Sequence, residues 1–206
     1  MAEALTAHPA DAAPRLLGAS LRHETPDGTV VVRITEVEAY GAADDPGSHA
    51  HRGRTARNAS MFEAPGTLYC YLIYGMHVCA NVAAGPAPGE PGAVLLRAGE
   101  VVEGLEVARS RRTTRAGRTP RDRDLARGPA NLCRALALDL THDGHRLDAG
   151  TPTLTIGDRP AAGEVASGPR VGLRAAAERP WRWWLVDDPT VSQYRPAAPL
   201  RPRERP

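Results

Sequence analysis

Two glutamates, Glu36 and Glu38, stand near the end of the segment TVVVRITEVEAY over 29–40. The segment is rich in β-branched residues and follows an Asp27-Gly28 turn, so it predicts a strand. Alternate side chains of a strand share a face, and the apolar residues before the glutamates on that face predict that it points into the core. They are Val30, Val32 and Ile34. A buried carboxylate is paired, protonated or placed in a wet pocket for acid–base chemistry. The alternative is that the strand end twists out to solvent.

Aromatic rings on the following elements could form the walls of a flat slot. Tyr69 and Tyr71 fall on one face of a predicted strand, where they either pack in the core or line such a slot. Tyr40 and His49 could supply further faces if the long loop after Tyr40 folds back over the strands. Tyr74 stands at a predicted hairpin tip, where a ring has little reason to be buried and can serve as a wedge between bases.

The loop sequence around His49 and His51 could hold a metal ion. Both histidines follow Asp44 and Asp45, and His-x-His with carboxylates is a common ligand set. The same histidines could instead make hydrogen bonds or stacking contacts, and no further ligand stands at a telling spacing. We therefore predict neither a metal nor another cofactor. The cysteines are far apart and form no zinc, iron–sulfur or disulfide pattern. They are Cys70, Cys79 and Cys133.

All 26 basic residues are arginine, and the chain has no lysine. The formal net charge is only +2, so an affinity for nucleic acid must come from where the arginines cluster. The segment 109–123 holds seven of them, 52–57 holds three, and the tail from Arg195 holds four. The first cluster lacks aromatic residues, so it either contacts phosphates or forms a solvated loop. Without lysine, only the α-amino group could form a Schiff base with a sugar.

The pattern of apolar residues predicts a single α+β domain with a mixed, mostly antiparallel sheet, peripheral helices and a protruding β-hairpin. The hairpin is the strand pair over 67–84, which turns at Tyr74-Gly75. Further strands are expected over 93–100, 154–157, 170–173 and 183–186, and helices over 11–21, 103–112 and 130–138. The domain is expected to span 1–194, with a mobile start over 1–14. An Arg- and Pro-rich tail over 195–206 is expected to be disordered.

Four blocks of the sequence closely resemble the alkyladenine (3-methyladenine) DNA glycosylase family. They are EVEAYGAADDPGSHAHRGRTARNASMF, PGTLYCYLIYGMHVCANV, AVLLRA and LARGPANLCRALAL. The blocks recur in the family's order and cover most of the chain from Leu16 to about Val191. The resemblance implies a single α+β domain with an antiparallel sheet and a β-hairpin that enters the minor groove of DNA.

The resemblance also implies a role for the polar and aromatic residues described above. Glu38 matches the residue that activates water for attack on the anomeric carbon of the flipped nucleotide, and Arg97 matches an arginine near that water and the backbone. Tyr74 matches the side chain that fills the space left by the flipped nucleotide. The residues that match the base pocket are Tyr40, His49 and Tyr71, which stack on the base, and Asn81, which clashes with the amino group of guanine. His49 also matches a hydrogen-bonding partner of the purine.

Contacts with the DNA backbone are expected at Arg54, Thr55, Arg57, Gly75, Met76 and Arg127. One departure from the family matters, because Asn131 stands where the family commonly has a lysine in its G-P-x-K-L block. Either Arg127 or Arg134 could replace the backbone contact of that lysine.

The sequence therefore predicts a monofunctional DNA glycosylase, without abasic-site lyase activity, that hydrolytically excises alkylated or deaminated purines of the 3-methyladenine, 7-methylguanine, hypoxanthine and ethenoadenine class. Its expected partner is double-stranded DNA with damaged purines, on which it acts as a monomer without a cofactor. No apolar run is long enough to span a bilayer and no secretory signal is present, so a cytoplasmic, nucleoid-associated protein is expected. Two alternatives stay open: a non-catalytic damage-binding module of the same fold, and a metal hydrolase that uses His49, His51 and Asp45.

Overall fold

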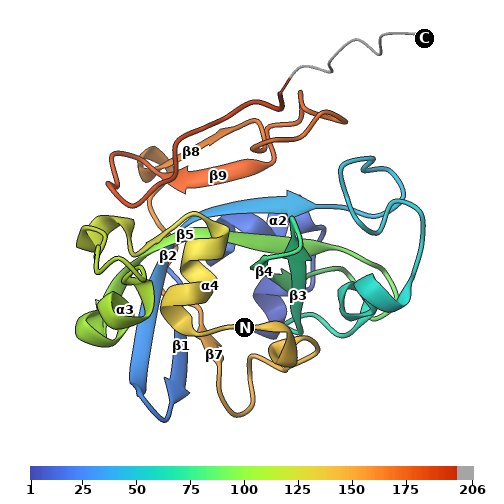
Figure 1. The fold of residues 1–206 in the computed structure, drawn as a ribbon. Helices are drawn as coiled ribbons and strands as arrows, with labels where there is room; N and C mark the ends of the chain where they lie inside the picture. The colour runs from blue at the N-terminus through green and yellow to red at the C-terminus, as the bar shows by residue number, and fades with distance from the viewer. Residues whose placement is uncertain (199–206) are drawn as a thin grey trace, which may run out of the picture.

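The computed structural model describes residues 1–198, whose frame is one antiparallel sheet (Figure 1). The strands are β1 (Ser20–Thr25), β2 (Gly28–Tyr40), β3 (Leu68–Ile73), β4 (His77–Ala83), β5 (Ala93–Glu103), β6 (Ala126–Arg127), β7 (Thr153–Thr155), β8 (Val165–Gly168) and β9 (Arg182–Leu185). The main path runs β3-β4-β5-β2-β1-β7, while β6 pairs with β5 and the β8–β9 hairpin joins the sheet through β2. Every strand pairing within residues 1–198 is antiparallel, so the predicted α+β class with a mostly antiparallel sheet is confirmed.

The helices are short and pack around this sheet. The α-helices are α1 (Ala2–Leu5), α2 (Pro9–Ala12), α3 (Leu105–Arg112) and α4 (Pro129–Leu136), and the 3-10 helices are η1 (Ala13–Leu16), η2 (Ala56–Phe62), η3 (Asp122–Asp124), η4 (Leu140–His142) and η5 (Ala162–Glu164). Helix α4 packs on β2, β4 and β5 through a face that includes Leu132 and Leu136. Leu5 and Ala12 are fully buried in the same apolar core. Part of the segment 1–14, which the sequence predicts to be mobile, is thus packed on the core, while Glu3, Thr6 and Asp11 are exposed.

Two β-bulges decide where the glutamates of β2 point. Thr35 interrupts the register of β2, and Arg97 interrupts that of β5 immediately afterwards. Before the bulge at Thr35, Ile34 points into the core. After it, the side chains that point into the core are those of Val37 and Ala39. An extra residue moves the side chains that follow it to the opposite face of a strand. The prediction that the glutamates continue the core face is therefore wrong. Both are nevertheless 0 % exposed, so a strand end turned to solvent is also excluded.

Two predicted elements differ from the structure. The helix expected over 11–21 ends early, because α2 and η1 finish at Leu16 and the chain then enters β1, which contains Leu21. Both leucines reach the core, but from a helical turn and a strand rather than from one helix face. The strand expected over 170–173 is a loop, and the strand of this region is β8. The remaining predicted elements match β2, β3, β4, β5, β7, β9, α3 and α4 to within a few residues.

The arginine-rich segment 109–123 begins inside α3 and is engaged by the protein itself. Arg109 pairs with Asp122 at 2.8 Å, and Arg111 pairs with Asp27 at 2.9 Å. These two arginines therefore pair with carboxylates of the protein itself. Among the described residues, the other arginines of the segment form no ion pair, so they are the ones available to contact phosphates.

The tail predicted to be disordered over 195–206 lies outside the described residues from 199 onward. Its first residues are held by the loop after β8: the carbonyl of Arg195 accepts a hydrogen bond from the backbone of Gly172, and that of Ala198 accepts one from Arg174. Within residues 1–198, no helix combines the length and apolar character needed to cross a membrane.

Candidate active site

Glu38, near the end of β2, is fully buried and is held by three groups. The backbone N–H of Val171 donates to Oε1 at 2.6 Å, and the hydroxyl of Tyr40 donates to Oε2 at 2.7 Å. An ion pair joins Oε1 to Arg97 at 3.4 Å. Burial and the charge of Glu38 raise the pKa of Tyr40 well above its usual value, so this phenol stays protonated and remains a donor. The carboxylate therefore has a fixed orientation, as a positioned base requires.

Glu36 has a different environment, although it is only two residues away. Its carboxylate accepts from Arg97 at 3.0 Å and from Arg182 at 2.6 Å. It also accepts from the backbone N–H and the hydroxyl of Ser192, at 2.8 and 3.0 Å. Burial alone would raise the pKa of Glu36, but the charges of the two arginines outweigh it and lower the pKa. Glu36 is thus a saturated anion that anchors Arg97 beside Glu38.

A cavity of about 260 Å³ opens beside Tyr40. It brings together the four residues predicted for the base pocket: Tyr40, His49, Tyr71 and Asn81. The other residues that line it are Gly47, Met61, Tyr69, Ile73, Gly172 and Leu173. Sites for drug-sized ligands typically measure about 300–1,000 Å³, so this cavity suits a single flat ring system rather than a whole nucleotide.

The rings around the cavity meet one another edge to face and face to face. His49 Nδ1 lies 2.9 Å from the hydroxyl oxygen of Tyr69, and the imidazole meets the Tyr71 ring at 80° with centroids 4.7 Å apart. Tyr69 and Tyr71 stack with centroids 5.4 Å apart. Burial, with a smaller effect of the nearby Arg57, lowers the pKa of His49. The imidazole is therefore neutral near pH 7, and because Nδ1 is engaged by Tyr69, Nε2 is the nitrogen left to recognise a base.

Asn81 lies in β4 opposite Tyr69 and is 3 % exposed. Its side-chain Nδ2 donates to the backbone carbonyl of Tyr69 at 3.0 Å, which fixes the plane of the amide. Because Asn81 also lines the cavity, the side chain has both a structural bond and a place in the cavity wall.

The predicted β3–β4 hairpin ends in an exposed tip. Tyr74 and Gly75 have φ values of 54° and 68°, the left-handed geometry of tight hairpin turns, which is uncommon for tyrosine. Tyr74 is 84 % exposed and Met76 is 71 % exposed. Large side chains presented in this way at a narrow tip suit insertion between base steps.

The arginines predicted to contact the DNA backbone fall into two groups. Arg57 donates to the carbonyl of Leu72 at 3.1 Å and so lies against the hairpin. Arg54 pairs with Glu63, and the neighbouring Thr55 is bonded to Asn58 at the start of η2. All three predicted contacts, at Arg54, Thr55 and Arg57, are exposed. Arg127 stands apart from them, in β6.

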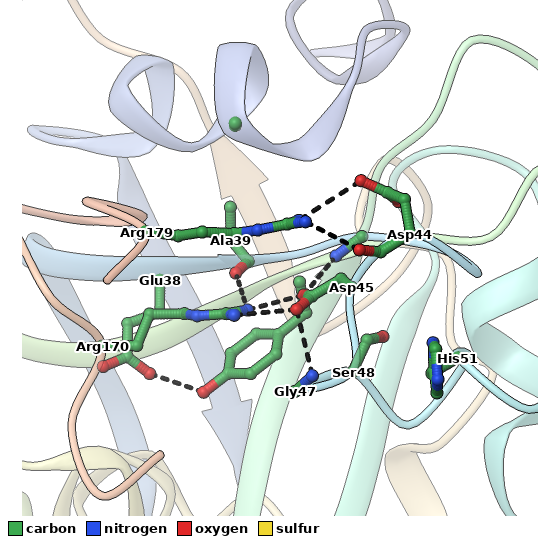
Figure 2. Close-up of polar contacts among 12 residues, drawn as sticks. Glu38, Ala39, Asp44, Asp45, Gly47, Ser48, His51, Arg170 and Arg179 are labelled. Carbon is green, nitrogen blue, oxygen red and sulfur yellow. Dashed lines mark hydrogen bonds and ion pairs between the residues drawn. The ribbon is translucent and has the colours of Figure 1, made fainter. Parts of the chain in front are cut away.

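A fully buried ion pair holds the loop after β2 against the loop between β8 and β9. Arg170 donates to both carboxylate oxygens of Asp45, at 2.6 and 2.8 Å, and neither side chain is exposed (Figure 2). Asp45 also accepts from the backbone N–H groups of Gly41 and Gly47. Arg170 donates in addition to the carbonyl of Ala39 at 3.0 Å. The pair therefore ties together two loops that both line the cavity.

The Asp45–Arg170 pair lies next to Tyr40 and Val171, the two residues that donate hydrogen bonds to Glu38. Ala39 and Gly41 flank Tyr40, and the Arg170 guanidinium carbon lies 4.8 Å from the centroid of the Tyr40 ring. Arg170 also immediately precedes Val171, the backbone donor to Glu38. The pair thus fixes both hydrogen-bond donors of the buried carboxylate.

The residues of the metal-site hypothesis are not brought together. Asp45 is occupied by Arg170, and His49 faces Tyr69. His51 Nδ1 lies 2.7 Å from the carbonyl oxygen of Ala43. Among residues 1–198, no group of three histidine, cysteine or acidic side chains could hold a metal ion.

Similarity to known proteins identifies the family. The sequence profile described as Methylpurine-DNA glycosylase (MPG) matches residues 3–189. The chain is 52% identical over 197 residues to a protein of Leifsonia xyli subsp. xyli, covering 94% of this chain and 91% of that protein. It is 53% identical over 206 residues to a protein of Nocardia farcinica, covering 96% and 93%. Both carry the name "Putative 3-methyladenine DNA glycosylase". The chain belongs to the methylpurine-DNA glycosylase family.

The family resemblance seen in the sequence blocks is therefore confirmed, and with it a place in base-excision repair of alkylated purines. Sequence reasoning missed four residues of this glycosylase's site: Val171, which donates to Glu38, Arg170, which pairs with Asp45, and Arg182 and Ser192, which bind Glu36. Val171 lies 133 residues from Glu38 in sequence, in a loop without periodicity. The one usable signal in the sequence was the glycine at 172, because glycine is common in turns. In the structure Gly172 has a φ of 71° and lies in a turn where a strand was expected.

Proposed function

We propose that this methylpurine-DNA glycosylase is a monofunctional enzyme that flips a damaged purine nucleotide out of double-stranded DNA and hydrolyses its N-glycosidic bond. Tyr40 carries the proposal, because it both lines the base-sized cavity and donates to the buried carboxylate of Glu38. The substrates are alkylated or deaminated purines of the 3-methyladenine, 7-methylguanine, hypoxanthine and ethenoadenine class. The enzyme acts as a monomer without a cofactor.

The arrangement supports a direct hydrolytic mechanism. Extrusion of a base costs a few kcal/mol, and less where damage has weakened the pair. The extruded base stacks against Tyr40, His49 and Tyr71, and a cationic alkylated purine is attracted to such rings. Tyr74 fills the gap in the duplex. Glu38 takes a proton from water as the water oxygen bonds to C1′, and the C1′–N bond breaks with its electron pair leaving on the base. A cationic alkylated purine leaves as the neutral base, whereas a neutral purine leaves as its anion and takes up a proton from solvent. The carboxylate also stabilises the electron-poor sugar of the transition state.

Duplexes that each carry one defined lesion test this proposal. The protein should release free base from at least one of them and leave the undamaged duplex intact, as measured by chromatography of the released base. Tight binding to every lesion without any release would instead favour a damage-binding module of the same fold.

The product should be an intact abasic site, because the chain has no lysine. Cleavage of the strand requires an amine that forms a Schiff base with the sugar, and here only the α-amino group of Met1 remains. Borohydride added during turnover should therefore trap no covalent protein–DNA adduct, while a lyase-type glycosylase in parallel should be trapped. An adduct with this protein would contradict the monofunctional assignment.

Shortening Asn81 to serine should admit guanine. Guanine differs from hypoxanthine by an amino group at its minor-groove edge, which the amide of Asn81 can exclude by contact or by leaving it unpaired. Such a penalty is on the order of 1–3 kcal/mol, so Asn81→Ser should raise guanine excision from mismatched pairs by about 10- to 100-fold. Hypoxanthine excision should stay within a few-fold.

The bond from Asn81 to the Tyr69 carbonyl provides the competing explanation. If that bond is the whole role of Asn81, the variant should lose activity on both bases alike and melt at a lower temperature. The ratio of guanine to hypoxanthine excision by the same preparation separates the two roles.

A further inference from the structure

The guanidinium of Arg97 is held at each of its nitrogen atoms by a different residue. Its Nε donates to Glu36 at 3.0 Å, and its Nη1 forms the ion pair with Glu38 at 3.4 Å. Its Nη2 donates to the hydroxyl of Ser192 at 3.3 Å. A guanidinium is planar, so the bonds at Nε and Nη2 fix the direction in which Nη1 points. The contact between Arg97 and the carboxylate of Glu38 therefore depends on Glu36 and Ser192.

The hydroxyl of Ser192 serves two charged neighbours at once. A hydroxyl has one proton to donate and two lone pairs with which to accept. Here the proton goes to Oε1 of Glu36 at 3.0 Å, and a lone pair accepts from Arg97. The backbone N–H of Ser192 donates to Oε2 of Glu36 at 2.8 Å, and its carbonyl accepts from Arg182 at 3.0 Å. One residue thus bonds to Glu36 and to both of the arginines that pair with it.

The chain on either side of Ser192 is itself held in place. The carbonyl of Val191 accepts from Nε of Arg127 at 2.8 Å. The carbonyl of Arg195 accepts from the backbone N–H of Gly172 at 3.0 Å, in the loop that also supplies the backbone donor to the buried carboxylate. A side chain can orient a neighbour only if its own position is fixed, and these bonds fix that of Ser192.

Ser192 is half-buried and adjoins a cavity of about 490 Å³, which Arg97 also lines. If the hydroxyl were removed, water from this cavity could reach Nη2 of Arg97, so no buried donor would be left without a partner. Loss of a hydrogen bond costs much stability only where it leaves a buried group unsatisfied. The serine hydroxyl therefore contributes little that water could not, except a fixed position.

We propose that Ser192 is a positioning residue for base excision, because its hydroxyl orients Arg97 so that the guanidinium meets the carboxylate of Glu38. The proposal rests on the proposed function, in which Glu38 takes a proton from water. Arg97 and the backbone N–H of Val171 both contact Oε1 of Glu38, whereas the hydroxyl of Tyr40 bonds to Oε2. Without the serine hydroxyl, Oε1 keeps one fixed partner instead of two. A displacement of about 1 Å at a reacting group can cost on the order of 10²-fold in rate.

The variant Ser192→Ala removes the hydroxyl and keeps the backbone bonds to Glu36 and Arg182. It should release a damaged base about 10- to 100-fold more slowly in single turnover at saturating enzyme, the factor that corresponds to a hydrogen bond with a charged group. Its affinity for a duplex with an uncleavable tetrahydrofuran abasic analogue, measured by fluorescence anisotropy, should stay within a few-fold of the wild type. Ser192→Thr keeps the hydroxyl, and its methyl group has the cavity beside it, so this variant should restore most of the rate.

The matched control is Ser60→Ala. The hydroxyl of Ser60 also donates to a carboxylate, that of Asp143 at 2.8 Å, and Ser60 is buried but lines neither cavity. If a lost hydroxyl slowed excision through stability alone, both variants would be slow and would melt at a lower temperature. We expect instead that Ser60→Ala excises at the wild-type rate, and that Ser192→Ala is slow although its melting temperature is close to that of the wild type.

Side-chain NMR of Arg97 measures its orientation without any turnover. A guanidinium held at every nitrogen rotates slowly about its Cζ–Nε bond, so the terminal N–H groups should exchange slowly in the wild type and in Ser192→Thr, and faster in Ser192→Ala. Unchanged exchange in Ser192→Ala, or excision by this variant at the wild-type rate, would overturn the proposal. If the wild type released no base while the exchange still differed between it and Ser192→Ala, the proposed function alone would be wrong.

Discussion

Replacing Glu38 with glutamine is expected to slow release of a damaged base by about 10²- to 10⁴-fold, the usual contribution of a positioned general base. Glutamine has the shape of glutamate, so its carbonyl oxygen can still accept the N–H of Val171, but it cannot take a proton from water. Binding of lesion DNA should change by no more than a few-fold, because the cavity walls remain. Single-turnover excision at saturating enzyme measures the rate of base release. Fluorescence anisotropy with a duplex that carries an uncleavable tetrahydrofuran abasic analogue measures the affinity for DNA separately.

Glu36 is the only nearby carboxylate on the same strand face that could replace Glu38. Its oxygens already accept from two guanidinium groups and from Ser192, which leaves them no place for a catalytic water. Turnover of Glu38→Gln within tenfold of the wild type would nevertheless move the general base elsewhere, and a slow Glu36→Gln variant with a normal melting temperature would then identify it.

The parts of the site that sequence reasoning places correctly are those set by local patterns. The alternation in 29–40 and the turn residues Tyr74-Gly75 specify β2 and the hairpin, since strand period and turn geometry depend on neighbours in sequence. Tyr40, His49 and Tyr71 meet in one cavity, as the aromatic pattern suggested, and the resemblance to a family added Asn81 to that group.

The parts that could not be predicted depend on contacts between distant segments. Nothing in the local sequence marks Thr35 as a bulge, because the bulge arises from the pairing of β2 with β5. A strict alternation therefore put the glutamates on the wrong face. The same reason hides Val171 and Arg170, which reach Glu38 and Asp45 from a loop without periodicity. The sequence pattern placed Leu21 on a helix face with Leu16 and Leu17. A short apolar pattern cannot distinguish a helix from a turn followed by a strand, because both bury the same three leucines.

The variant Asp45→Asn is expected to lower the free energy of unfolding by about 3–5 kcal/mol, because it leaves the fully buried Arg170 without its counter-charge. Urea unfolding at pH 7 measures the loss. Asp44 is a matched control, since it stands next in sequence and its side chain, 61 % exposed, pairs with Arg179 at 3.3 Å. Figure 2 draws both ion pairs. Asp44→Asn should cost no more than about 1 kcal/mol.

Two further measurements show whether the charge itself is responsible. The double variant Asp45→Asn, Arg170→Met should be more stable than Asp45→Asn, because it removes the uncompensated cation. Acid should also shrink the difference from the wild type. Burial raises the pKa of Asp45, but the bonds from Arg170 outweigh this and lower it. The stabilisation is therefore present above the ordinary value of about 3.9 and is lost as the pH falls through the lower folded-state pKa. The urea midpoints of the wild type and Asp45→Asn should converge there, and parallel curves down to that pH would mean that packing, not charge, makes this pair important.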